Sequence, residues 1–185
     1  MMLFKNCTLL LALTSVVLLS SCSKKNINSE NISSINNAKI IRNVPFVRQR
    51  DKFCGPAAMA SVMNFYGQNV SQDEIAKEVY SPELKGALIS DMENFAREMG
   101  YNASTVNGDE NTLISLVDEG IPSIILVDLG IWVVSVPHYY VVYGYNESKE
   151  TFIINTGFTS SKEINFKDLD KEWEKMNRLM LIVRK

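Results

Sequence analysis

The sequence is poor in the two side chains that most often hold zinc. Its 185 residues include three cysteines and one histidine, His138. A structural zinc site needs about four Cys or His ligands grouped at short spacings, and the sequence contains no such group. We therefore expect neither a metal nor any other cofactor.

An excess of charge of one sign is also missing. The 19 Lys and Arg residues are balanced by 21 Asp and Glu residues, which gives a formal net charge of −2. No basic stripe with interleaved aromatic residues is present, so nucleic acid is not an expected partner. The sequence also lacks the Gly-x-x-x-x-Gly-Lys-Ser loop that binds ATP phosphates.

The first residues form an export signal pattern. An apolar run over residues 9–19 follows Lys5 and leads into Leu19-Ser20-Ser21-Cys22. The run is shorter than the roughly 20 residues that cross a bilayer, and small residues before a cysteine are typical of a cleavage site. The pattern predicts a lipoprotein signal peptide at residues 1–21, with a short transmembrane anchor as the alternative.

Cleavage would make Cys22 the first residue, and acylation of Cys22 would attach the chain to membrane lipid. Ser23 stands where aspartate would favour inner-membrane retention in a Gram-negative cell. We therefore expect a protein of the bacterial cell envelope, anchored to the outer membrane and facing the periplasm. Cys7 would leave with the signal, so Cys54 would be a lone thiol that cannot form an internal disulfide.

Two regions follow the signal. Residues 22–43 are dominated by Asn, Ser and Ile without periodicity, which predicts a flexible tether. Residues 44–185 are long enough for one domain with its own hydrophobic core.

Helical patterns dominate the first half of that domain, and strand patterns dominate the second. Apolar residues recur at helical spacing after Cys54 as far as Gly67, and again over residues 111–119. Ser71 and Ser90 each stand three residues before a glutamate, the spacing of a capping box, and predict two more helices. Strands are predicted at residues 124–127, at 138–145 and 152–154 as a hairpin, and at 179–183 after a last helix. The order predicts an α+β fold with N-terminal helices packed on a C-terminal antiparallel sheet.

Three side chains carry the candidate chemistry. Cys54 opens a helix, where the positive end of the helix dipole stabilises a thiolate. His138 begins a strand, which would hold an imidazole base rigidly. Gln49 lies five residues before Cys54, so its amide and the Cys54 backbone N–H would both reach a developing oxyanion. A thiol, an imidazole and an amide are the parts of a nucleophilic hydrolase, although a lone buried cysteine is otherwise a common core residue.

These residues sit in a wider pattern that resembles the double-glycine leader peptidases that process bacteriocins. That family is papain-like, and the likeness is to its stand-alone secreted or lipoprotein members. The matching segments are Val44-Pro45-Phe46 with Gln49, Cys54-Gly55-Pro56-Ala57-Ala58, Tyr66-Gly67, Gly120-Ile121-Pro122, His138-Tyr139-Tyr140-Val141-Val142 and Gly144-Tyr145. The resemblance implies a papain-like cysteine peptidase fold, with Cys54 as nucleophile, His138 as base and Gln49 as oxyanion donor.

The sequence departs from the family at the residue that orients the histidine. The family usually supplies an aspartate in an Asp-Pro pair, whereas this chain reads Ile154-Asn155-Thr156-Gly157. Side chains alternate along a strand, so the residue that pairs with His138 decides which side chain shares its face. If His138 pairs with residue 157, Asn155 shares its face. If His138 pairs with residue 156 or 158, Thr156 does. We favour Asn155, and rank Asp128 lower because it is well placed to cap the loop at Gly130.

Together these features predict a membrane-anchored, extracytoplasmic cysteine peptidase that acts on a peptide or protein substrate through an acyl-enzyme. Two alternatives stay open. One is a catalytically weak or inactive peptidase-like lipoprotein that binds peptides or cell-wall fragments, which the missing aspartate favours. The other is an amide hydrolase that acts on peptidoglycan.

Overall fold

The computed structural model describes residues 38–185. The predicted signal peptide at residues 1–21, the predicted acylation at Cys22 and residues 22–37 of the predicted tether lie outside the described residues. Within the described part of the chain, no helix has both the length and the apolar character needed to cross a membrane.

Residues 38–185 alternate between helices and strands. The α-helices are α2 (Cys54–Phe65), α3 (Gln72–Val79), α4 (Ile89–Glu98), α5 (Glu110–Glu119) and α6 (Phe166–Trp173). Short 3-10 helices are η1 (Glu147–Lys149) and η2 (Glu174–Met176). The strands are β1 (Ala38–Ile40), β2 (Tyr80–Ser81), β3 (Gly86–Ala87), β4 (Asn102–Asn107), β5 (Ser123–Asp128), β6 (Pro137–Asn146), β7 (Thr151–Asn155), β8 (Lys162–Asn165) and β9 (Leu179–Arg184).

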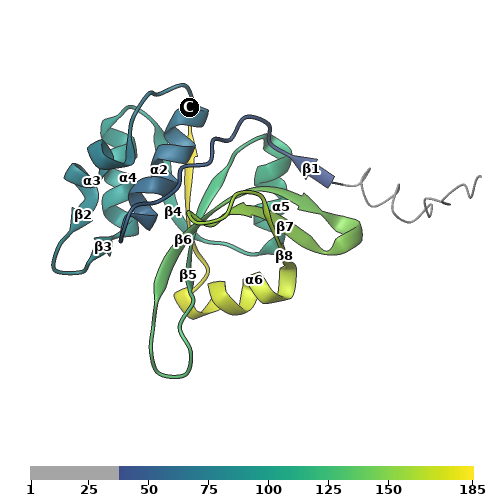
Figure 1. Ribbon diagram of the computed structural model, residues 1–185. Coiled ribbons are helices and arrows are strands. Elements are labelled where there is room, and N and C mark those ends of the chain that lie inside the picture. The colour runs from purple at the N-terminus through teal and green to yellow at the C-terminus, as the bar shows by residue number, and fades with distance from the viewer. Residues whose placement is uncertain (1–37) are drawn as a thin grey trace, which may run out of the picture.

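One antiparallel sheet organises the domain. Its strands follow the order β4-β9-β5-β6-β7-β8, and β1 pairs with β6. Helices α2, α3 and α4 gather on one side of this sheet, whereas α5 and α6 lie on the other (Figure 1). The predicted α+β class is confirmed, and so are the predicted helix after Cys54 and the β6–β7 hairpin.

The sheet separates two hydrophobic cores. Tyr139 and Val141 of β6 pack with Met59 and Met63 of α2 in one core. Tyr140 and Val142, which alternate with them along the strand, pack in the other core with residues of α5 and α6. Because β6 is buried on both faces, its sequence reads as a nearly continuous apolar run rather than an alternation.

Strand β1 extends the domain beyond the predicted boundary at residue 44. Ala38, Lys39 and Ile40 pair with Asn146, Tyr145 and Gly144, and the next residue, Ile41, is buried. A Cβ at Gly144 would lie 3.0 Å from the carbonyl oxygen of Lys39, so glycine lets the two backbones approach closely. The last residues assigned to the tether therefore belong to the sheet.

The two predicted capping boxes have different outcomes. At Ser71 the reciprocal capping box with Glu74 is present at the start of α3. At Ser90 it is not, because α4 begins one residue earlier, with Leu88 at the N-cap and no side-chain cap. Ile89 packs against the α2 core and enters the helix before Ser90. The prediction of a Ser90 cap was wrong.

The two serines offer a matched pair of substitutions. Ser71→Ala removes the side-chain acceptor for the Glu74 N–H, and we expect a loss of about 1 kcal/mol in the free energy of unfolding. Ser90→Ala removes an exposed serine from the first turn of α4, where it is not the N-cap, and we expect a change within about 0.5 kcal/mol. Urea unfolding measures both values. Equal losses would contradict the assigned helix starts.

Candidate active site around Cys54

Cys54 is the first residue of α2, and the sequence around it allows unusually close packing. A Cβ at Gly55 would lie 2.9 Å from the Ala87 Cβ and 3.0 Å from the Met92 sulfur. Glycine is therefore required for the first turn of α2 to pack against β3 and α4. Pro56 occupies a position in that turn where a missing N–H costs no helical hydrogen bond.

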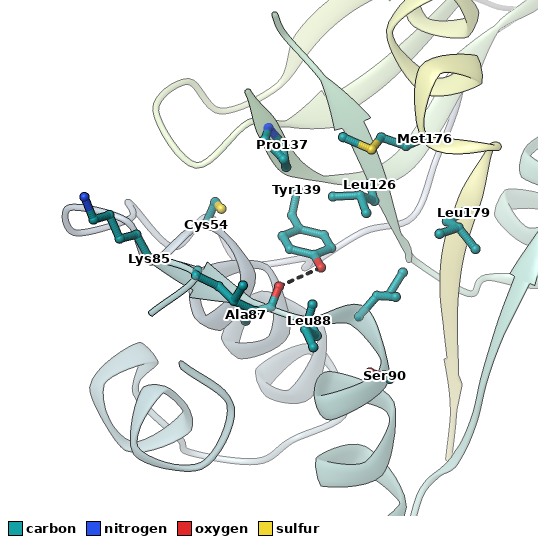
Figure 2. A pocket seen from close by; sticks show the side chains of 13 residues that line it. Cys54, Lys85, Ala87, Leu88, Ser90, Leu126, Pro137, Tyr139, Met176 and Leu179 are labelled. Atoms are coloured by element: carbon teal, nitrogen blue, oxygen red, sulfur yellow. Dashed lines mark hydrogen bonds between the residues drawn. The ribbon is translucent and has the colours of Figure 1, made fainter. Parts of the chain in front are cut away.

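The thiol of Cys54 borders a cavity of about 440 Å³. The wall opposite α4 comes from Leu126, Pro137 and Tyr139, and the segment that carries β3 closes another side (Figure 2). The Tyr139 hydroxyl donates a hydrogen bond of 3.0 Å to the carbonyl oxygen of Ala87, which ties the sheet to the β2–β3 hairpin. The lining is predominantly apolar, as expected of a site that binds an apolar group.

Burial dominates the electrostatics of the thiol. It raises the pKa of Cys54, although hydrogen bonds from the backbone N–H groups of Tyr139, Gly55 and Cys54 itself oppose the shift. Burial disfavours the charged form of an acid. The thiol is therefore neutral near pH 7 in this geometry.

His138 lies on the opposite face of the sheet. It pairs across from Val127 of β5, and its ring packs edge-on against Tyr140 and stacks with Phe158 at 5.8 Å between centroids. Its Nε2–H donates a hydrogen bond of 2.7 Å to the carbonyl oxygen of Thr156. In the neutral ring this leaves Nδ1 as the proton acceptor.

The structure therefore does not bring His138 to Cys54. The residue that faces the thiol from β6 is Tyr139, and no hydrogen bond links Cys54 to the imidazole within residues 38–185. Burial lowers the pKa of His138, with the Thr156 hydrogen bond acting in the opposite sense. Both candidate catalytic groups are held in their neutral forms.

The pairing of β6 with β7 decides which residue accompanies His138. Val141 lies across from Asn155, and continuing this register places His138 across from residue 158. Thr156 thus shares the face of His138, whereas Asn155 lies on the Cys54 side and lines a small second cavity together with Cys54. The Asn155 Oδ1 accepts the Ser161 N–H, and its buried Nδ2 has no hydrogen-bond partner among residues 38–185.

Asp128 serves the loop rather than the histidine. Its carboxylate accepts the N–H groups of Gly130 and Val136, each at 2.7 Å, and the hydroxyl of Ser135. These donors keep the pKa of Asp128 below its ordinary value. The capping role that the sequence suggested for Asp128 is confirmed.

Gln49 is positioned through Gly157. Its backbone N–H donates to the Gly157 carbonyl oxygen at 2.9 Å, and its side chain covers the space that a Cβ at Gly157 would fill. Gly157 has a φ of +80° and lines the small cavity with Cys54. In the described part of the chain, the buried Oε1 of Gln49 has no hydrogen-bond partner. The Gln49 side chain therefore lies near the small cavity that Cys54 lines, and its amide oxygen is not held by a hydrogen bond within residues 38–185.

Two parts of the site were not found from the sequence. Tyr139 lies within a predicted strand and was given no role in the site, and the segment around β3, which carries Ala87 and Leu88 to the cavity, has no predicted element or role. Side chains alternate between the two faces of β6, so knowing which face His138 or Tyr140 occupies would have placed Tyr139 on the Cys54 face. Among residues 38–185, no three His, Cys, Asp or Glu side chains are grouped so that they could hold a metal ion.

Comparison with known proteins gives a consistent picture. The sequence model of the Peptidase_C39 like family matches residues 41–181. The peptidase domain of Streptococcus ComA, a bi-functional ABC transporter involved in a quorum sensing pathway, is 26% identical with a TM-score of 0.64, and the match covers 76% of this chain and 98% of that domain. No curated protein sequence matches the chain significantly.

Two further solved structures share the fold. A putative C39-like peptidase from Bacillus anthracis has 17% identity and a TM-score of 0.66, with 80% of this chain and 98% of that chain covered. A double glycine motif protease from an AMS/PCAT transporter, solved in complex with the leader peptide, has 21% identity and a TM-score of 0.61, with 76% and 91% covered. The predicted papain-like fold is confirmed.

The buried histidine predicts a specific pH dependence of stability. The pKa of His138 is lower in the folded protein than in the unfolded chain, so the unfolded chain binds more protons below about pH 6.5. We expect the free energy of unfolding to fall between about pH 7 and 5.5, above the range where carboxylates titrate. Urea unfolding across this range measures the slope.

His138 is the only histidine of the sequence, and His138→Phe is the matched variant because it keeps a ring against Phe158. It should lose the dependence between about pH 7 and 5.5. A variant that retained the full slope would show that His138 is not buried in its neutral form.

The substrate-free thiol should be poorly reactive. Because burial raises the pKa of Cys54, we expect alkylation by iodoacetamide to be slow at pH 7 and to accelerate only above about pH 8.5, the ordinary range for cysteine. His138→Phe should leave this profile unchanged, since the ring lies on the other face. A thiolate that persisted to lower pH and depended on His138 would place the imidazole beside Cys54.

Proposed function

The chain belongs to the Peptidase_C39 like family, and from this premise we propose that it is a cysteine peptidase that hydrolyses peptide bonds through Cys54 and His138 while anchored in the cell envelope by Cys22. The observation that carries the proposal is the position of Cys54. It begins an α-helix and borders an apolar cavity large enough for a substrate side chain. A core cysteine with a purely structural role would have no need of such an opening.

Each candidate residue has one role in the proposed reaction. The Cys54 sulfur attacks the carbonyl carbon of the peptide bond, and its proton passes to Nδ1 of His138. The Gln49 amide and the Cys54 backbone N–H donate hydrogen bonds to the oxyanion. The C–N bond then breaks, the imidazolium protonates the leaving amine, and a thioester remains on Cys54. Water attacks the thioester with His138 as base, which releases the carboxylic acid and restores the thiol.

This reaction requires His138 to reach the face of the sheet that Cys54 occupies. A β-bulge at Tyr143 offers a route, because the pairing with β7 passes from Val142–Ile154 directly to Gly144–Ile153. Before the bulge, the even-numbered residues Tyr140 and Val142 face α5 and α6. From the bulge onward, the odd-numbered residues Tyr143 and Tyr145 face these helices. Moving this extra residue to a point before His138, together with a one-residue shift of the pairing between β5 and residues 138–142, would exchange the faces of these residues and turn the imidazole toward Cys54.

The proposed substrate is a peptide with an apolar side chain next to the scissile bond. The cavity beside Cys54 is apolar, and one structurally similar protease was solved with a leader peptide bound. Leu88, Leu126 and Leu179 supply much of the lining. Placement at the outer membrane, facing the periplasm, rests on the signal pattern and on Ser23 after Cys22.

One observation favours a second function. Cys54 and His138 lie on opposite faces, and burial favours the neutral form of both. A chain that kept this arrangement with substrate bound would hold a peptide in the cavity without cleaving it. Such a peptide-binding lipoprotein is the second candidate.

Substitutions at the three proposed roles test the reaction. With a fluorogenic library of peptides rich in apolar residues, Cys54→Ala should abolish turnover and His138→Phe should reduce kcat about 10²- to 10⁴-fold. Gln49→Ala should reduce kcat about 10²-fold or more. Arg48→Ala is the matched neighbour of Gln49, and we expect unchanged turnover because the Arg48 side chain is exposed and its hydrogen bond to the Phe158 carbonyl oxygen is long, at 3.5 Å.

Two results would redirect the proposal. Library peptides that bind the wild-type chain and Cys54→Ala equally, with no cleavage by either, would establish the binding function instead. Clearing of a cell-wall zymogram by wild type and not by Cys54→Ala, with no peptide cleaved, would make peptidoglycan the substrate.

A further inference from the structure

The loop at residues 129–136, between β5 and β6, carries a cluster of exposed apolar side chains. It reaches out from the body of the domain as a long hairpin (Figure 1). Ile131 is 72% exposed, Trp132 99%, Val133 98% and Val134 63%. Contiguous exposed apolar surface of this kind marks an interaction site in a folded protein.

The hairpin is held as a formed projection. The Leu129 N–H donates to the Val136 carbonyl oxygen at 3.0 Å, and the Val134 N–H closes the tip by donating to the Ile131 carbonyl oxygen at 3.2 Å. Trp132 has a φ of +62°, a conformation that costs a side-chain-bearing residue about 1 kcal/mol or more. The fold therefore maintains the tryptophan at the tip against both a backbone cost and the cost of exposing it to water.

Charges are confined to the base of the hairpin. No charged residue occurs from Leu129 to Pro137. Asp128 is satisfied by donors within the loop, and the Lys175 ammonium donates to the carbonyl oxygens of Gly130 and Asp128. The tip is thus apolar, and the base carries both a carboxylate and an ammonium group, which is the order in which a lipid surface presents apolar acyl chains below charged headgroups.

The shape of the loop favours lipid over a peptide partner. Peptides are usually bound in a groove or along a free strand edge. The tip is convex and lies outside β5 and β6, in a turn closed by the hydrogen bond from the Val134 N–H to the Ile131 carbonyl oxygen, so it offers no extended strand edge to a peptide. Tryptophan is enriched where proteins meet the membrane interface, since its ring sits at the headgroup level.

We propose that the tip of this hairpin, Ile131 to Val134, inserts into the headgroup and acyl-chain boundary of a membrane. The proposal goes beyond the peptidase function and agrees with the proposed anchor, because the segment from Cys22 to Ala38 can span at most on the order of 50 Å. Leu126 and Pro137, at the base of the hairpin, line the cavity beside Cys54. Insertion would hold the mouth of the cavity near the membrane surface.

Tryptophan fluorescence tests the insertion directly. The chain has two tryptophans, and Trp173 is buried with its ring N–H bonded to the Leu179 carbonyl oxygen. The full chain is reconstituted into vesicles of phosphatidylcholine and phosphatidylglycerol, with and without brominated phosphatidylcholine. The Trp132 signal is the difference between wild type and Trp132→Phe. We expect brominated lipid to quench this signal, and the vesicles to shield it from acrylamide.

A matched probe controls for general contact with the vesicle. Met99→Trp, made in the Trp132→Phe background, places a tryptophan at another exposed position, at the end of α4. We expect acrylamide and not brominated lipid to quench it. Equal quenching of both positions by brominated lipid would overturn the proposal, since the whole domain would then lie against the bilayer.

Other outcomes also decide the matter. Trp132 that stays accessible to acrylamide in chains that float with the vesicles would overturn the loop insertion and leave the Cys22 anchor standing. Chains that do not float with the vesicles would overturn both. A lipid-free blue shift of Trp132 emission that grows with protein concentration would show that the tip binds a second copy. Peptide turnover, measured separately, is independent of all these results.

Discussion

The register of β6 is the constraint on which the rest of the structure depends. This strand pairs with β5 over Pro137–Val142 and with β7 from Val141 onward, and both of its faces are buried, so its apolar side chains pack in one core or the other. Tyr139 and Val141 support α2, whereas Tyr140 and Val142 support the core under α5 and α6. A slip of one residue would exchange these sets. The position of one extra residue, at Tyr143, therefore determines the surroundings of every side chain from His138 to Val142.

The same register sets the chemical state of the candidate catalytic groups. Cys54 is half-buried on one side with Tyr139 as its neighbour, and His138 is buried on the other with Phe158 against its ring. Burial raises the pKa of the thiol and lowers that of the imidazole, so each group loses its charge. A thiolate–imidazolium pair would offset these costs only if the two groups were in contact. Formation of the thiolate–imidazolium pair thus depends on the register of the β6 backbone.

Strands β5 and β6 also connect the cavity to the exposed loop. Leu126 and Pro137 line the cavity, and the chain between them forms the apolar hairpin. Asp128 lies at the junction and accepts three hydrogen bonds, from Gly130 near the start of the loop and from Ser135 and Val136 at its end. Because the hairpin and the cavity wall belong to the same two strands, whatever the tip binds fixes the orientation of the cavity.

Local patterns predicted the elements that depend on neighbouring residues alone. The helix after Cys54, the capping box at Ser71 and the hairpin of β6 and β7 are examples. Strand β4 was not predicted, because Asn102 to Asn107 is mostly polar and becomes a strand by pairing with the distant β9. Strand β1 was not predicted for the same reason, since it forms against β6 across a close contact at Gly144.

The sequence by itself determined the family, the fold class and the small set of groups capable of chemistry: one free thiol in the domain, one imidazole and one amide ahead of the helix. Only the tertiary structure decided which of them meet. It placed Thr156 rather than Asn155 beside His138, and Tyr139 rather than His138 beside Cys54. The reason is physical: side-chain direction along a strand has a period of two, so a single bulge, set by pairing and by packing on both faces, reverses it.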